Sequence, residues 1–374
     1  MLDELDKLSS DFRGDPASAL LEVLDPEQNK SFVDHYLGVE FDLSKVMFIA
    51  NANNLATIPG PLLDRLEVIE ISGYSEEEKL AIAEKYLIPK QLKEKGLGLE
   101  NYHFSKDSIS TLINDYTRES GLRGLEKQIA SVCRKIARNV ALDTLPADRQ
   151  VLKSECVRDH LGARKFEREF SFAEPLPGVA FGLAYTNYGG EVLTVEVNLI
   201  PSKTAGLTLT GRLGEVMKES AQAALSYIRS QATVLGIDPA ILSRNELHIH
   251  VPAGAMPKDG PSAGTALATA ILSALLNQKT KRAVAMTGEI TIHGKVLAIG
   301  GLREKALAAR REGIPKILIP KRNEPDWKEL PQYLKDSLEV QFVSDYHEVL
   351  GELFDIPQMT LLEQPSIFSH NIAS

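Results

Sequence analysis

The 374 residues suffice for two or three domains that each bury a core, and 43% apolar with 25% charged residues is typical of a soluble globular protein. The net charge of −9 gives no support for binding dominated by nucleic acid or by an anionic membrane surface. The sequence contains no apolar run of about 18 residues and no signal peptide, so it predicts a cytoplasmic protein without a membrane span.

The first 75 residues alternate short apolar segments with loops. Within them, residues 46–50 form a continuous apolar run that is followed by Asn-Ala-Asn-Asn. Such a run is typical of a strand buried on both faces, and polar residues after its carboxyl end indicate a ligand site. We therefore expect a buried parallel strand that ends beside a bound ligand.

Residues 76–145 have the spacing of helices. Ser75, which precedes three glutamates, predicts a helix N-terminus, because serine caps the first turn and acidic side chains are favourable there. Gly121 and Gly124 are expected to break this helical part before a further helix begins. The pattern loosens at 146–175, which predicts a hinge or linker.

Beyond Pro177 the pattern changes to strands that alternate with helices. Residues 192–197 and 207–210 alternate polar and apolar side chains, as half-buried strands do. The further elements expected are a helix at about 214–235, a strand at 247–251, a helix after Ser262, a strand at 282–287, a helix from about Leu302, a strand at 317–320 and a helical end at 349–354. The tail from Pro357 is weakly patterned and is expected to be flexible.

Ser262 stands directly after a Gly-Pro corner in the sequence PKDGPSAG, at 257–264, and it precedes a helical run of small residues. This arrangement exposes the side-chain oxygen and directs the free N–H groups of the helix start toward whatever the serine attacks. Backbone N–H groups around Asp259, Gly260 and Ser262 could therefore stabilise an oxyanion. A serine in this position could equally serve only as a helix cap.

Lys305 lies in the sequence GGLREKA, at 300–306, between apolar segments. A lysine acts as a base only in its neutral form, and burial favours that form by lowering the pKa. Arg303, Arg310 and Arg311 would lower the pKa further if they lay close to the amine. A serine nucleophile with a lysine base indicates hydrolysis of an acyl bond, whereas the alternative is a solvated lysine without a chemical role.

These two motifs, together with LHIHVP at 247–252 and TGEIT at 287–291, resemble the proteolytic domain of the ATP-dependent Lon proteases. The resemblance extends from Met1 to about residue 350. It implies a homohexameric ring that uses ATP and Mg²⁺ to unfold misfolded and regulatory proteins and cleaves them in an enclosed chamber. Protein and peptide substrates are then the expected partners, without a membrane or a nucleic acid.

The resemblance also implies a role for individual residues. Ser262 and Lys305 match the catalytic dyad of the family, and Thr287 matches a strand threonine that helps to orient the lysine. Asp259 could be read as the third member of a triad. Without a histidine base to orient, it is expected instead to shape the cleft or to restrain Lys305 before substrate arrives.

His248 and His250 are two residues apart and would project from the same face of a strand. This spacing suits a catalytic histidine, a metal pair or a hydrogen-bonded structural role, and the resemblance favours the structural role. The two cysteines, Cys133 and Cys156, lack metal-ligand spacing and are expected to be small buried hydrophobic residues.

Near the N-terminus, LDELD at 2–6 resembles the Walker B motif of an AAA+ ATPase. The resemblance implies that Asp3 holds Mg²⁺ through water and that Glu4 polarises the hydrolytic water. Three further residues match nucleotide contacts of the family, namely a sensor asparagine at Asn53, an arginine finger at Arg65 and a second sensor arginine at Arg123.

The phosphate-binding sequence G-x-x-x-x-G-K-[ST] does not occur in the chain. We therefore expect binding of ATP and Mg²⁺ to be weak or lost. The start at Walker B predicts a piece of a longer protein whose pore loop and recruiting domain lie upstream. Whether this reflects a cut sequence, a gene fragment or a genuine short form stays open.

The sequence thus predicts an α/β multidomain protein. Its expected parts are a truncated AAA+ α/β core at 1–74, a small α-helical AAA+ domain at 75–165, an α/β Lon-type protease domain at 166–354 and a flexible tail at 355–374. The alternatives to an ATP-dependent serine endopeptidase are an ATP-independent peptidase and an inactive assembly module of a Lon ring. Some DNA-repair ATPases use a Lon-like domain for binding alone, and Ser262 within its motif argues against that function.

Overall fold

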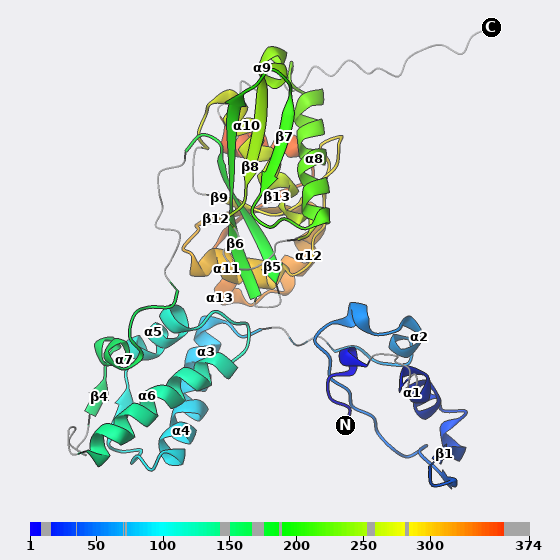
Figure 1. Cartoon of the computed structure of the whole chain (residues 1–374), viewed down its shortest axis with the longest axis vertical. Coiled ribbons are helices and arrows are strands. Elements are labelled where there is room, and N and C mark those ends of the chain that lie inside the picture. Colours follow the sequence, from blue (N-terminus) through cyan, green and yellow to red (C-terminus); the bar gives the residue numbers. More distant parts are fainter. Residues whose placement is uncertain are drawn as a thin grey trace. The chain divides into compact units, whose positions relative to one another are not determined.

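A computed structural model of the chain describes residues 1–8, 16–34, 36–69, 71, 73–142, 150–166, 176–186, 189–252, 259–280 and 284–354 (Figure 1). The chain divides into two compact units, Met1–Ile71 and Ser72–Ser374. The predicted hinge at 146–175 falls partly outside the described residues, and the predicted tail at 355–374 falls wholly outside them. No helix in the described ranges has both the length and the apolar character needed to cross a membrane.

The first unit has a small core in which Leu5, Ile58 and Leu62 are buried. Its elements are helices α1 (Pro16–Leu24) and α2 (Gly60–Leu63) and an antiparallel pair of strands, β1 (Phe32–Asp34) and β2 (Val39–Phe41).

The prediction of a buried strand at 46–50 is wrong. Ala50 makes a single parallel bridge with Leu2, and the side chain of Met47 is 84% exposed. A buried parallel strand needs pairing on both edges and cover on both faces. Leu2 forms backbone hydrogen bonds with Ile49 and Asn51. This single neighbouring segment does not bury residues 46–50.

The second unit begins with a helical part. Its helices are α3 (Glu76–Ile82), which continues through a π-helical turn into α4 (Ile88–Glu94), then α5 (Lys106–Tyr116), α6 (Arg123–Ala141) and α7 (Ser154–Leu161). Two short strands missed by the sequence pattern, β3 (Tyr102–Phe104) and β4 (Gln150–Leu152), pair in parallel. The apolar faces of these helices enclose one core, in which Ile109, Leu125 and Ile129 are fully buried.

The predicted cap at Ser75 is confirmed, because its hydroxyl accepts from Glu78 N at 3.2 Å and Glu78 Oε2 accepts from Ser75 N at 2.7 Å. The predicted break is confirmed at Gly121, which lies between α5 and α6, but the prediction for Gly124 is wrong. Gly124 lies in the first turn of α6, where its N–H and that of Leu125 donate to the carboxylate of Glu119. A carboxylate from outside the helix thus caps α6 and lets it begin before the glycine.

The rest of the second unit is built on a seven-stranded mixed sheet in the order β13-β12-β9-β5-β6-β8-β7. Its strands are β5 (Val179–Thr186), β6 (Gly189–Pro201), β7 (Gly206–Thr210), β8 (Asn245–His250), β9 (Val284–Met286), β12 (Lys316–Pro320) and β13 (Glu339–Val343). The pairs β5–β6 and β6–β8 are antiparallel, and the other neighbours are parallel. The mixed α/β class is therefore confirmed.

Helices cover both faces of this sheet (Figure 1). One core lies beneath α8 (Glu215–Ser230), α10 (Gly264–Leu276) and α14 (Tyr346–Leu353), and the other beneath α11 (Leu302–Arg311), α12 (Glu324–Glu329) and α13 (Gln332–Lys335). Side chains of one strand alternate between the two cores, as Leu318 belongs to the first and Ile317 and Ile319 to the second. The remaining elements are α9 (Pro239–Arg244) and the hairpin of β10 (Glu289–Ile290) and β11 (Val296–Leu297).

Candidate active site

Ser262 lies in a short 3-10 turn (Pro261–Ala263) that leads directly into α10. Gly260 precedes the turn and has a φ of 131°, which residues other than glycine rarely adopt. Ser262 is half-buried, whereas Gly264 and Thr265 behind it are buried. The serine therefore sits where a buried helix reaches the surface.

The backbone of Ser262 is bound to the segment that follows β9. Its carbonyl oxygen accepts from Gly288 N at 2.9 Å and from the Thr287 hydroxyl at 3.2 Å, and Thr265 N donates to Gly288 O at 3.0 Å. Thr287 itself is fully buried. The structure thus brings Thr287 to the serine residue, and its expected role in orienting Lys305 stays a prediction.

Asp259 caps a helix that is distant in sequence. Gly214, at the start of α8, has no side chain to cap it, and Asp259 Oδ1 accepts from Met217 N at 3.0 Å. The same oxygen accepts from Gly260 N at 3.0 Å. A second link to α8 comes from Ser220, whose hydroxyl donates to Pro261 O at 3.3 Å. The segment before the nucleophile candidate is thereby fixed to α8.

Lys305 is buried as the sequence predicted, with 2% of its surface exposed, and this burial lowers its pKa to about 8. An ammonium loses hydration on entering the protein interior, so the neutral amine is favoured. Arg303 and Arg310 were expected to add to this effect, but burial alone lowers the pKa, and the two guanidinium groups form ion pairs with Glu78 and Glu77. The amine is therefore available in its neutral form near physiological pH.

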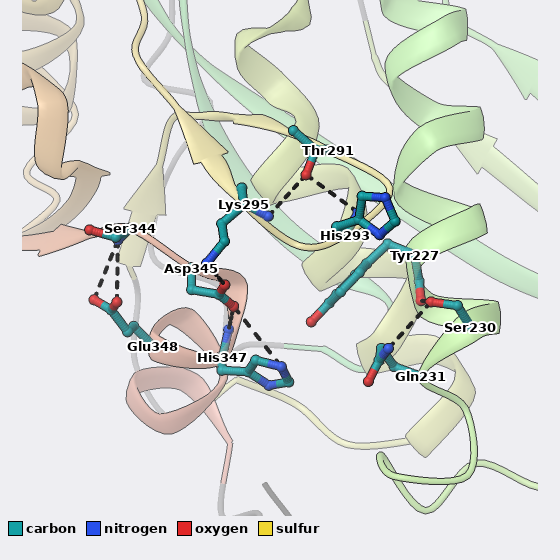
Figure 2. A network of polar contacts seen from close by, with 10 residues as sticks. All are labelled: Tyr227, Ser230, Gln231, Thr291, His293, Lys295, Ser344, Asp345, His347 and Glu348. Atoms are coloured by element: carbon teal, nitrogen blue, oxygen red, sulfur yellow. Dashed lines mark hydrogen bonds and ion pairs between the residues drawn. The ribbon is translucent and has the colours of Figure 1, made fainter. Parts of the chain in front are cut away.

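A hairpin connects Thr287 to the helix of Lys305, and Figure 2 shows its turn. Lys295 Nζ lies 3.1 Å from Asp345 Oδ2, and Tyr346 N donates to Gly294 O at 2.8 Å. Gly294 has a φ of 83°, and a Cβ there would lie 2.5 Å from the ring of Tyr227, which is buried on α8. The hairpin between Thr287 and α11 is thus anchored on α14 and α8.

The two histidines of β8 share one partner. Thr210 Oγ1 lies 2.9 Å from His248 Nε2 and 2.7 Å from His250 Nδ1. This contact links β8 to β7 in the manner of a structural hydrogen bond. Within the described ranges, no group of three histidine, cysteine or acidic side chains could hold a metal ion.

The nucleotide residues expected in the first unit are exposed. Asp3 has an exposed side chain, and Glu4 has a φ of 54° and pairs with Lys7 at 2.7 Å. Arg65 donates from Nη1 to Pro61 O at 3.0 Å and lies 3.4 Å from a carboxylate oxygen of Asp25.

Asn53 of the first unit is also exposed, and Arg123 is an exposed residue at the first position of α6 in the second unit. The exposed carboxylates could face water-bound Mg²⁺, but the chain provides no glycine-rich loop for the phosphates.

A cavity of about 330 Å³ lies between the start of α3 and α11 in the second unit, and its lining includes Lys79, Glu119 and Arg310. Neither Ser262 nor Lys305 lines it. The cavity instead borders the outer side of α11, because Glu304, Leu307 and Arg311 of that helix line it.

Sequence reasoning missed Ser220. It belongs to the buried stripe of α8 with Met217, Ala221 and Ala224, where the helical spacing would place an apolar side chain. A serine in such a stripe signals a buried hydrogen bond. Ser220 lies 42 positions before Ser262 in sequence, so the motif around Ser262 does not include it.

Known proteins resemble the chain over nearly its whole length. Residues 151–355 match the family described as Lon protease (S16) C-terminal proteolytic domain, residues 93–147 match the Lon protease AAA+ ATPase lid domain, and residues 1–74 match the ATPase family associated with various cellular activities.

Three curated relatives show the extent of the similarity. The chain is 54% identical over 353 residues to "Lon protease" of Syntrophomonas wolfei, which covers 94% of this chain and 43% of the relative. It is 53% identical over 351 residues to "Lon protease" of Dictyoglomus thermophilum, which covers 94% of this chain and 44% of the relative. It is 53% identical over 350 residues to "Lon protease 1" of Bacillus subtilis, which covers 94% of this chain and 45% of the relative. The chain thus spans less than half the length of these relatives.

Proposed function

The chain belongs to the Lon protease family, and from this premise we propose that it is a serine endopeptidase in which Ser262 is the nucleophile and Lys305 the general base. The observation that carries the proposal is the buried amine of Lys305, whose pKa of about 8 keeps part of it neutral near physiological pH. A neutral amine can accept a proton, which an ordinary surface lysine at this pH cannot do.

The proposed reaction has two halves. Lys305 Nζ takes the proton of the Ser262 hydroxyl while the oxygen attacks the peptide carbonyl, and the ammonium then protonates the leaving amine. In the second half, Lys305 takes a proton from water, the hydroxide attacks the acyl-enzyme ester, and the proton returns to Ser262. Each half therefore begins and ends with a neutral lysine.

Backbone N–H groups near Ser262 would stabilise the oxyanion formed in each half. The candidates from sequence include Asp259 and Gly260. The Gly260 N–H donates to Asp259 Oδ1, so it can stabilise the oxyanion only after this hydrogen bond breaks.

For the intact protein we propose ATP-dependent degradation of misfolded and regulatory proteins by a homohexamer. Asp3, Glu4, Asn53, Arg65 and Arg123 would be its nucleotide contacts. A polypeptide of this sequence should bind ATP weakly, because it lacks the phosphate-binding sequence G-x-x-x-x-G-K-[ST]. Each charge-assisted hydrogen bond from that loop to a phosphate would contribute about 1.5–3 kcal/mol. Calorimetry checks this, and micromolar affinity for ATP would contradict it.

The competing function is an inactive assembly module, and a serine-directed acylating probe separates the two. The peptidase proposal expects the probe to label Ser262 and expects a fluorogenic peptide to be cleaved. Both signals should vanish in Ser262→Ala and persist in Ser226→Ala, which alters an exposed serine of α8. A folded wild-type chain with neither signal would favour the assembly module.

A further inference from the structure

Gly190, the second residue of β6, lies against the backbone of the helix that carries Lys305. A Cβ at position 190 would lie 1.8 Å from the carbonyl oxygen of Glu304 and 3.0 Å from Lys305 N. Atoms cannot approach at such distances, so strand and helix can be this close only with glycine. The φ of Gly190 is not in the left-handed region, so contact with α11 is what excludes a side chain.

Two other contacts join α11 to the same pair of strands. Arg311, the last residue of the helix, donates from Nη2 to the carbonyl oxygen of Gly190 at 3.0 Å. At the other end, Gly301 caps the helix with a φ of 66°, and a Cβ there would lie 2.9 Å from the ring of Tyr185. Tyr185 and Gly190 are register partners in the β5–β6 pair. This pair of residues in the sheet therefore contacts the N-cap and the first turn of α11 and the side chain of its last residue.

We propose that Gly190 is a positioning residue for Lys305, because it lets β6 hold the backbone of α11 where the amine enters the protein interior. This inference rests on the proposed role of Lys305 as the base. A side chain at position 190 would push α11 away from β6 and let water reach the amine. The pKa of Lys305 would then return toward its ordinary value of 10.5.

A purely structural glycine would give a different result. Its replacement would lower the stability of the fold and leave the proton affinity of Lys305 unchanged. The test therefore measures the pKa of the amine directly, by competitive labelling with acetic anhydride at a series of pH values and mass spectrometry of the Lys305 peptide. The pH dependence of kcat for a fluorogenic peptide is measured in parallel.

The variants are Gly190→Ala, Arg311→Met and a matched control, Gly206→Ala. The control alters a glycine of the same sheet whose Cβ would have the side chain of Glu246 as its nearest neighbour, at 3.2 Å. Gly190→Ala should raise the pKa of Lys305, shift the pH profile to alkaline values and lower kcat at neutral pH by about 100-fold, since small displacements of a catalytic group have such effects. Arg311→Met should shift both readouts in the same direction by less, and Gly206→Ala should shift neither.

A folded Gly190→Ala with unchanged lysine pKa and pH profile would overturn the proposal. If this variant does not fold, Arg311→Met decides by the same two readouts, and their constancy would again overturn it. If the wild-type chain cleaves no peptide but Gly190→Ala still raises the pKa of Lys305, the positioning holds and the proposed function fails. The two claims are therefore tested separately.

Discussion

The hydroxyl of Thr287 donates a hydrogen bond to the carbonyl oxygen of Ser262 across 3.2 Å. Thr287 is fully buried and belongs to the segment after β9, so this bond joins the sheet to the turn that presents the nucleophile candidate. The site is thus held together through backbone atoms of Ser262 rather than through its side chain.

Replacement of Thr287 by Val should weaken this connection. The variant keeps the shape of the side chain and leaves Ser262 O with its bond from Gly288 N. We expect a loss of about 1 kcal/mol in the free energy of unfolding and a slower acylation of Ser262. Urea unfolding and the rate of probe labelling measure these effects. Thr287→Ser, which keeps the hydroxyl, is the control, and identical labelling rates in all three proteins would contradict the prediction.

The pH dependence of peptide cleavage should follow the amine of Lys305. Its pKa in the folded protein is about 8, below the ordinary 10.5, and the active form is neutral. We therefore expect kcat to rise from pH 6 to pH 9 with a midpoint near 8. A flat profile over this range, measured with an uncharged fluorogenic peptide, would exclude a titrating base.

The same burial should cost stability. Below pH 8 Lys305 is protonated in the folded and in the unfolded protein, and the folded protein bears the full desolvation free energy of the buried ammonium. Between pH 8 and 10.5 the unfolded state binds more protons, so the contribution of this group to stability rises with pH. Lys305→Met should therefore raise the free energy of unfolding at pH 7 by on the order of 2 kcal/mol while it abolishes peptide cleavage.

Lys316 provides a matched control for this substitution. It is also buried, but its amine lies 2.9 Å from Glu339 Oε1 and 2.6 Å from Glu352 Oε2. Lys316→Met removes the ammonium that both partly exposed carboxylates contact and should destabilise the fold. Urea unfolding of both variants at pH 7 tests the contrast, and a loss of stability in Lys305→Met would refute it.

The sequence predicted those features that depend on neighbouring residues. The cap at Ser75, the start of α11 at Leu302 and the burial of Lys305 follow from local composition and spacing. The order of the seven strands could not be predicted, because it depends on which distant strands pair. The same limit explains the error at 46–50, where an apolar run suggested burial that its neighbours do not provide.

The site shows the same division. The motifs identified Ser262 and Lys305 through their own surroundings in sequence. The residues that contact their backbone segments, Thr287, Gly190 and Ser220, are distant in sequence, and only folding brings them to the motifs. Asp259 stood inside a motif, and yet its partner, the N-terminus of α8, could not be seen in the sequence.

Asp259 is expected to act as a helix cap. Asp259→Ala removes the acceptor for Met217 N and should lower the free energy of unfolding by about 1 kcal/mol. Because the contact is with α8, the pH midpoint of cleavage should stay where Lys305 sets it. Asp238→Ala removes a comparable N-cap at the start of α9 and serves as the control for the loss in free energy of unfolding. A shift of the pH midpoint in Asp259→Ala would show instead that this carboxylate acts on Lys305.

The central claim is that Ser262 and Lys305 act as one catalytic unit, and a double-mutant comparison of kcat/KM tests it most directly. Members of a nucleophile–base pair are strongly non-additive, because either loss disables the same step. With a fluorogenic peptide at pH 8, Ser262→Ala, Lys305→Gln and the double variant should show the same residual activity. Near wild-type turnover in Lys305→Gln, or a double variant whose loss is the product of the two single losses, would contradict the account.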